Sequence, residues 1–125
     1  MQIVYMTITG QTRKFVSKLG MDSFEINQAN PFVSMDKEFL LVVPTYDEEA
    51  TSIVNDFLET GDNISLCAGV CGGGNRNFGN LFCFTAKDIA KEYALPLIHL
   101  FEFQGSDNDV NNVEERIGQI ESEHK

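Results

Sequence analysis

The residues that could do chemistry begin with a hydroxyl-rich segment near the amino terminus. It reads, in order, Thr7, Ile8, Thr9, Gly10, Gln11 and Thr12. If a helix begins here, its free backbone N–H groups and positive dipole end favour a bound anion. Gly10 would let the backbone close around a phosphate, and no Lys or Arg appears before Arg13. The segment predicts a phosphate monoester held by neutral donors; an ordinary helix-capping turn is the alternative.

A second candidate segment is rich in glycine and asparagine. It contains Gly72, Gly73, Gly74, Asn75, Asn77, Phe78 and Gly79. Three consecutive glycines are costly to order unless the backbone approaches another group closely or adopts positive φ. A flavin would use such a loop, because its N5 gains a proton on reduction and needs a backbone acceptor that can reorient. Phe78 could cover a ring face, and a floppy surface loop is the alternative.

A third candidate is aromatic. Pro44, Thr45 and Tyr46 directly follow an almost continuous apolar run at residues 38–43. Tyr46 could stack on a flat ring, which contributes about 0.5–1.5 kcal/mol beyond the burial of area. A half-buried tyrosine that caps the core would have the same sequence position.

Other phosphate chemistries do not fit the spacing. Cys71 and Arg76 are separated by four residues, whereas a phosphatase loop needs five. A Gly-x-x-x-x-Gly-Lys nucleotide loop is absent. A phospho-receiver needs an acidic pair after its first strand and a lysine after its fifth, where this chain has Thr7-Ile8 and Gln104.

Histidine and cysteine form no recognisable catalytic or metal site. The three cysteines, Cys67, Cys71 and Cys83, make no Cys-x-x-Cys pair and no zinc ligand set. We expect them to be small apolar residues in or near the core, with Cys71 the one near the predicted site. We expect His99 to pack in the core rather than to act in catalysis. No catalytic side chain and no metal ligand is assigned.

Short apolar runs alternate with helical periods along the chain. Strands are expected at residues 2–6, 23–26, 38–43, 63–71 and 97–103, and apolar helix faces within 15–19, 50–58, 86–94 and 110–120. Residues 27–37 must connect two strands without a clear helix, residues 106–109 should hold the last N-cap, and residues 121–125 should be frayed. This alternation predicts an α/β fold with a parallel sheet and helices on both faces.

Five strands in 125 residues suit one domain over residues 1–125 with a flavodoxin-like five-stranded parallel sheet of order 2-1-3-4-5. In such a sheet ligands bind at the carboxyl ends of the strands. All three candidate segments follow predicted strands, so we expect them to converge on this edge.

Charge and hydropathy limit the partners and the location. The chain has 9 Lys and Arg against 19 Asp and Glu, a formal net charge of −10. This charge repels nucleic acids and anionic membranes. No apolar run approaches the length of a signal-peptide core or a membrane span. A reducing cytoplasm is the expected location.

Several of these motifs resemble those of one family. Thr7-x-Thr9-Gly10-x-Thr12 resembles the phosphate loop of flavodoxins. The segment from Gly74 to Gly79, Gly-Asn-Arg-Asn-Phe-Gly, resembles the signature of the NrdI family, the flavodoxin-like partners of class Ib ribonucleotide reductase. Residues 44–46, 102–106 and 109–110 match the remaining loops of that family, so the resemblance spans nearly the whole chain.

The resemblance implies that FMN is bound non-covalently, with its phosphate at residues 7–12 and its ring between Tyr46 and residues 72–78. Reduced FMN would pass an electron to dioxygen. The resulting superoxide, or a related oxidant, would reach the manganese-binding small subunit of the reductase and drive assembly of its manganese–tyrosyl radical cofactor. An unidentified reductase or thiol-redox donor would reduce the flavin. Such a protein is a redox activator rather than a classical turnover enzyme; the alternatives are a general flavodoxin electron carrier and a non-flavin interaction module.

One segment departs from the family pattern. Members often carry glycines after Pro-Thr-Tyr, where this chain has Asp47, Glu48 and Glu49. Carboxylates facing the flavin would disfavour an anionic reduced ring. Facing outward, they would favour the N-terminus of the second helix or contact the partner. We expect the outward orientation, because carboxylates commonly begin helices.

Overall fold

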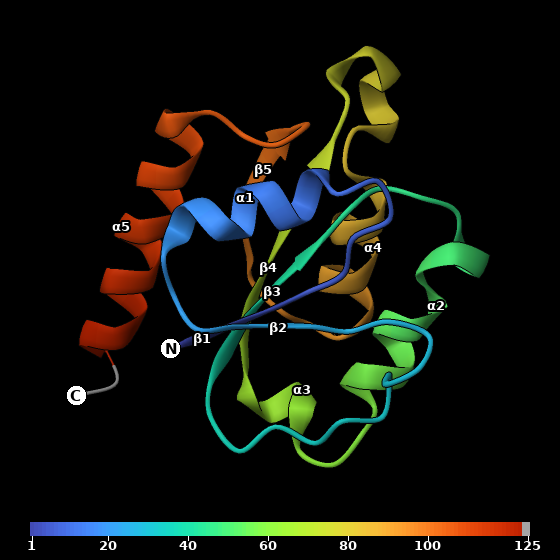
Figure 1. Ribbon diagram of the computed structural model, residues 1–125, viewed down its shortest axis with the longest axis vertical. Helices are drawn as coiled ribbons and strands as arrows, with labels where there is room; N and C mark the ends of the chain where they lie inside the picture. The colour runs from blue at the N-terminus through green and yellow to red at the C-terminus, as the bar shows by residue number, and fades with distance from the viewer. Residues whose placement is uncertain (124–125) are drawn as a thin grey trace.

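The fold is a five-stranded parallel sheet between two layers of helices, seen in a computed structural model that describes residues 1–123 (Figure 1). The strands are β1 (Gln2–Tyr5), β2 (Ser23–Glu25), β3 (Phe39–Val43), β4 (Cys67–Gly74) and β5 (Leu97–Glu102). Their order is β2-β1-β3-β4-β5, and every pairing is parallel. The predicted fold class and strand order are confirmed.

Helices cover both faces of the sheet. The helices are α1 (Gln11–Leu19), α2 (Glu48–Leu58), the short α3 (Asn63–Leu66), α4 (Phe84–Glu92) and α5 (Asp107–Glu123), with a 3-10 segment, η1, at Arg76–Leu81. Helices α1 and α5 pack on one face, and α2 and α4 on the other. No helix within residues 1–123 has the length and apolar character needed to span a membrane.

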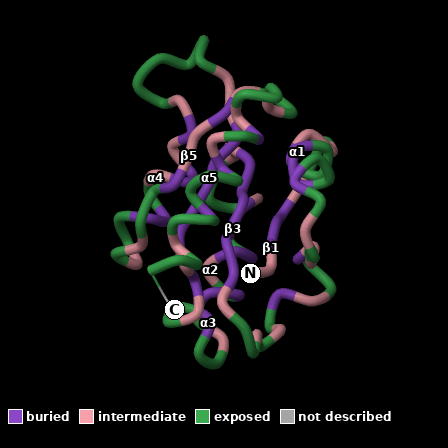
Figure 2. Tube along the Cα trace, turned by 90° about the vertical axis from the view of Figure 1, so that its left-hand side faces the viewer, coloured by how far each residue is buried: buried purple, intermediate pink, exposed green. Residues whose placement is uncertain are grey.

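The core is divided between the two faces because side chains alternate along a strand. Ile3, Leu40 and Val42 pack towards α1 and α5, whereas Val4 and Leu41 pack towards α2 and α4. All five side chains are fully buried, and Figure 2 shows β1 and β3 as buried trace. A strand that is buried on both faces needs apolar side chains on both, which explains the continuous apolar run of β3.

Two predicted segments differ from the structure by more than one residue. The strand expected at residues 63–71 begins only at Cys67 and continues to Gly74, while Asn63–Leu66 is helical. Helix α5 continues to Glu123 where a frayed tail was expected at residues 121–125, and residues 124–125 lie outside the described part of the chain. Ser106 caps α5, within the expected range, because its hydroxyl accepts a hydrogen bond from the N–H of Asp109 at 3.1 Å.

The side chain of Asn63, in the helical turn before β4, anchors the connection between β2 and β3. Asn63 is fully buried, and its amide nitrogen donates to the carbonyls of Val33 (2.8 Å) and Phe57 (2.7 Å). Its side-chain oxygen accepts from the N–H of Met35 at 2.8 Å. The connection crosses β1 without a helix, as expected. The amide of Asn63 therefore supplies backbone partners that a crossover helix would otherwise supply.

Replacing Asn63 with alanine should destabilise the protein. Three backbone groups would lose a hydrogen bond, and the carbonyl of Phe57 would keep only the N–H of Thr60. Lost buried hydrogen bonds of this kind predict a loss of about 2–4 kcal/mol in the free energy of unfolding. Urea denaturation followed by circular dichroism measures it. The exposed Asn111 on α5 is the matched control, and Asn111→Ala should leave the free energy of unfolding nearly unchanged. An Asn63→Ala variant as stable as this control would contradict the assigned role.

Candidate functional site

A cleft of about 410 Å³ lies at the carboxyl ends of the strands. It is lined by Ile8, Thr9, Gln11, Thr12, Pro44, Thr45, Tyr46, Gly73, Gly74, Asn75, Phe78 and Phe103. Its volume is within the range of roughly 300–1,000 Å³ that is typical of small-molecule sites. The lining comes from the segments that follow β1, β3, β4 and β5, as the topology of a parallel sheet predicts.

A larger hollow of about 760 Å³ lies at the opposite edge of the sheet. Its lining includes Gln2, Asp22, Asp36 and Glu38, and it has neither an aromatic wall nor a helix N-terminus. The smaller cleft is the better candidate, because the carboxyl edge collects the loops that carry chemistry.

Most of the residues proposed from the sequence meet in the cleft. Five do not line it, namely Thr7, Gly10, Gly72, Asn77 and Gly79. Phe103 lines it and was not proposed. The sequence signal for Phe103 is its place as the last residue of the strand predicted at residues 97–103, at the edge where the loops converge.

The hydroxyl-rich segment forms the N-terminal turn of α1. Gly10 occupies the N-cap position with φ of +91°, in the left-handed region that favours glycine. The hydroxyl oxygen of Thr7 accepts the N–H of Gly10 at 3.0 Å, so Thr7 shapes the turn rather than lining the cleft. Thr12 is buried at the cleft wall, whereas Thr9 is exposed.

The nearest cation in the chain is directed away from this turn. The guanidinium of Arg13 forms two hydrogen bonds with the carboxylate of Glu25 on β2, at 3.0 Å and 3.1 Å. No Lys or Arg lines the cleft. The donors that the turn offers to an anion are therefore backbone N–H groups and threonine hydroxyls, and all of these are neutral.

The glycines at residues 72–74 are not in a flexible loop, which corrects the expectation from the sequence. They form the end of β4, and none of the three has positive φ. The carbonyl of Gly73 accepts the hydroxyl of Thr45 at 2.6 Å, and the carbonyl of Gly74 accepts the N–H of Phe103 at 3.1 Å. These carbonyls are already engaged, so the backbone at residues 72–74 does not offer a freely reorienting acceptor.

Close packing explains why these positions are glycine. A Cβ on Gly72 would collide with the Cβ of Ala86 on α4. A Cβ on Gly73 would lie 2.8 Å from the ring of Phe101 on the opposite face. Here the glycines let a helix and an aromatic ring approach the sheet on both sides.

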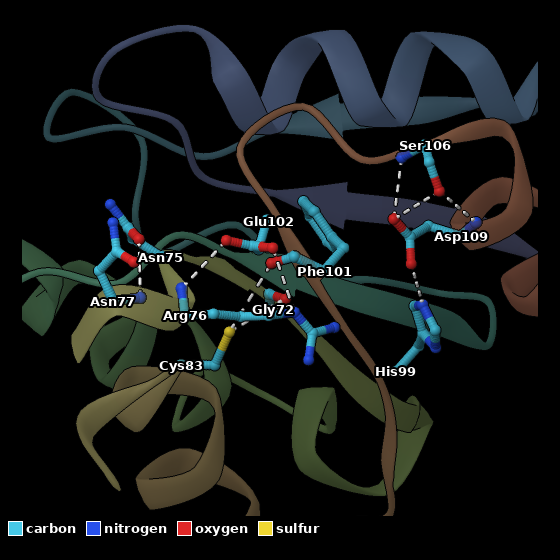
Figure 3. Close-up of polar contacts among 10 residues, drawn as sticks. All are labelled: Gly72, Asn75, Arg76, Asn77, Cys83, His99, Phe101, Glu102, Ser106 and Asp109. Atoms are coloured by element: carbon cyan, nitrogen blue, oxygen red, sulfur yellow. Dashed lines mark hydrogen bonds and ion pairs between the residues drawn. The ribbon is translucent and has the colours of Figure 1, made fainter. Parts of the chain in front are cut away.

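The segment after β4 is tied to the end of β5 (Figure 3). The carboxylate of Glu102 accepts the backbone N–H of Arg76 at 3.2 Å and pairs with the Nε of the same residue at 3.2 Å. The side-chain oxygen of Asn75 accepts the N–H of Asn77 at 2.9 Å and closes the turn. These contacts set the direction in which the segment carries Asn75 and Phe78 to the cleft.

Tyr46 is positioned by a threonine from α4. The hydroxyl of Thr85 accepts the N–H of Tyr46 at 3.2 Å and donates to its carbonyl at 3.0 Å. Thr85 is buried, so this double hydrogen bond is shielded from water. Both the N–H and the carbonyl of Tyr46 are thus held by Thr85, which fixes its backbone at the cleft wall.

The three carboxylates after Tyr46 take the outward orientation that we expected. Asp47 is the N-cap of α2, and its carboxylate accepts the N–H of Ala50 at 2.9 Å. Glu48 and Glu49 occupy the first turn of the same helix and are exposed. None of the three lines the cleft, and all lie where a helix dipole favours negative charge.

His99 is not a packed core residue, which corrects a second expectation. Its Nε2 lies 2.7 Å from a carboxylate oxygen of Asp109 on α5, and both side chains are about one-fifth exposed (Figure 3). Partial burial raises the pKa of Asp109, but hydrogen bonds from Ser106 and His99 outweigh it, so the pKa lies below its ordinary value. The pair joins β5 to the first turn of α5.

The cysteines are buried and unpaired, as expected. Burial raises the pKa of Cys67 and of Cys71 to about 12, and that of Cys83 to about 11. Cys71 packs in the core on the α1 and α5 side and does not line the cleft. Cys83 is nearer, because its sulfur would lie 3.0 Å from a Cβ on Gly74.

The thiols should be unreactive in the folded protein. With raised pKa values they remain protonated at about pH 8, and the thiolate is the reactive form. We expect no rapid reaction with Ellman's reagent in buffer and three equivalents in denaturant. Rapid modification of a thiol in the folded state would contradict the burial described here.

Comparisons with known proteins place the chain among relatives of one family. A family profile described as NrdI flavodoxin-like matches residues 3–115. The chain is 39% identical over 113 residues to a protein NrdI of Bartonella quintana, covering 86% of each chain. It is 34% identical over 125 residues to a protein NrdI of Beutenbergia cavernae, covering 94% of this chain and 91% of that one.

Solved structures show a similar fold. A short-chain flavodoxin associated with a bacterial microcompartment superimposes with a TM-score of 0.66 at 17% identity, covering 99% of this chain and 97% of that one. A flavodoxin of Streptococcus pneumoniae gives a TM-score of 0.65 at 16% identity, covering 98% and 97%. At this level of identity the likeness concerns the fold alone.

Proposed function

This chain belongs to the NrdI flavodoxin-like family, and we propose that its cleft binds FMN non-covalently. We further propose that the protein supplies superoxide, or a related oxidant, to the manganese-binding small subunit of a class Ib ribonucleotide reductase. The observation that carries the proposal is that one cleft is lined both by the neutral N-terminal turn of α1 and by aromatic side chains.

The residues present fit the two ends of FMN. The phosphate would bind at the N-terminal turn of α1, where free N–H groups and the hydroxyls of Thr9 and Thr12 meet. The flat ring would lie in the wider part of the cleft, against Tyr46 and Phe78. A dianion can bind in a chain of net charge −10 because its donors are local and neutral.

The chain contributes binding and orientation rather than proton transfer. When bound, FMN would supply one-electron chemistry towards dioxygen. Tyr46 carries the one ionisable side chain among the residues that line the cleft, so no acid–base pair is assembled there. Thr85 and Thr45 fix the walls through hydrogen bonds to the backbones of Tyr46 and Gly73.

The mouth of the cleft also suits a protein partner. Ile8, Phe78 and Phe103 line it and are 47%, 62% and 54% exposed. Exposed apolar side chains grouped around a cleft favour transient docking. We propose that the reductase subunit docks here and that an unidentified reductase or thiol-redox donor of the cytoplasm supplies the electrons.

A general flavodoxin electron carrier is the second candidate. The neutral turn that begins α1 and the aromatic side chains of the cleft would serve such a carrier equally well. Both candidates need FMN in the cleft, and they differ in whether an oxidant is delivered to a manganese-loaded subunit.

Thr12→Val should weaken FMN binding by about tenfold, because the phosphate would lose a donor in a partly dry pocket while the side-chain volume is kept. Flavin fluorescence titration measures the dissociation constants of FMN and riboflavin. Riboflavin lacks the phosphate and is the internal control, so its affinity should not change. Equal weakening of FMN and riboflavin binding would show that Thr12 does not contact the phosphate.

The oxidant proposal is tested by assembling the radical. The FMN-loaded protein is reduced stoichiometrically without air, mixed with the manganese-loaded small subunit and exposed to oxygen. Electron paramagnetic resonance should detect a tyrosyl radical only in samples that contain this protein. Normal electron transfer to a test acceptor without radical formation would favour the general carrier instead.

A further inference from the structure

The backbone at Phe103 is unusual for an aromatic residue. Its φ is +54°, in the left-handed region, and it is one of three non-glycine residues with positive φ among those described. This conformation favours glycine, since a Cβ crowds the neighbouring backbone there. An aromatic residue at such a position is an outlier that the surrounding structure must hold in place.

Several hydrogen bonds hold Phe103 in this conformation. Its N–H donates to the carbonyl of Gly74 at 3.1 Å, which ties it to the end of β4. The N–H of Gly105 donates to the carbonyl of Glu102 at 2.8 Å and closes the turn around it. Lys18 of α1 donates to the carbonyl of Gly105 at 2.9 Å. The turn is therefore anchored to both the sheet and α1.

Folding alone does not explain a phenylalanine here. Its side chain is 54% exposed and belongs to neither of the two core clusters. Glycine would relieve the backbone strain and remove only a partly exposed ring. The side chain does line the cleft, beside Gly73, Gly74 and Phe78.

The placement of the aromatic residues follows the sheet. Tyr46 follows β3, Phe78 follows β4 and Phe103 follows β5, and these strands are neighbours. The pair between Arg76 and Glu102 joins the segments that carry the last two rings. The three aromatic side chains thus line one cleft from successive strand ends.

We propose that Phe103 is a ring-binding residue, a third aromatic wall whose backbone strain is retained because its side chain contacts a flat heteroaromatic ligand in the cleft. This inference rests on the proposed function, with the isoalloxazine ring as the ligand. It assigns the end of β5 to ring recognition, alongside Tyr46 and Phe78.

The variant Phe103→Gly separates a ligand role from a structural one. Loss of a stacking partner should weaken riboflavin and FMN by the same factor, about fivefold. The thermal unfolding midpoint of the apoprotein should not fall. Glycine has more entropy in the unfolded state, but relief of the backbone strain at this position offsets that cost. Phe103→Trp should restore the affinity for both flavins.

The matched control is Phe32→Gly, which removes a 69% exposed phenylalanine of the β2–β3 connection that does not line the cleft. It should leave both flavin affinities unchanged. Unchanged affinities in Phe103→Gly, or lowered affinities that accompany a lowered unfolding midpoint and are not restored in Phe103→Trp, would overturn this inference alone. A parent protein that binds neither flavin would overturn the proposed function together with it.

Discussion

Burial of the parallel strands on both faces is the constraint on which the rest of the structure depends. Val4 and Leu41 need one helix layer, and Ile3 and Leu40 need the other. Each strand must therefore leave the sheet at its carboxyl end, cross a face and return, and every exit lies at the same edge. The cleft is a consequence of this connectivity.

The end of β4 sets the detailed shape of that cleft. Because Gly72 and Gly73 have no side chains, Ala86 and Phe101 approach the strand from opposite faces. The carbonyls of Gly73 and Gly74 accept hydrogen bonds from the hydroxyl of Thr45 and the N–H of Phe103 across the strand ends. What resembles a flexible loop in composition is in fact a close-packed strand that holds two walls of the site.

None of the described residues that line the cleft carries a charge, although the chain has a net charge of −10. The carboxylates of Asp47, Glu48 and Glu49 stabilise the start of α2 and leave the cleft without a fixed charge. Arg13 is neutralised by Glu25. A phosphate ester bound at α1 would therefore meet dipoles and hydroxyls rather than cations.

The sequence by itself determined the fold class, the strand order and most of the cleft lining, because period-two and helical patterns are local and parallel connectivity places strand ends together. Only the tertiary structure decided the remainder. Asn63 holds the β2–β3 connection through Val33 and Met35, which lie 30 and 28 residues away along the chain. The glycines of β4 leave room for Ala86 and Phe101, and His99 pairs with Asp109. Phe103 takes a glycine-like conformation through contacts with β4 and the turn around it. Such contacts join residues with no sequence periodicity between them, so their geometry exists only once the chain is packed.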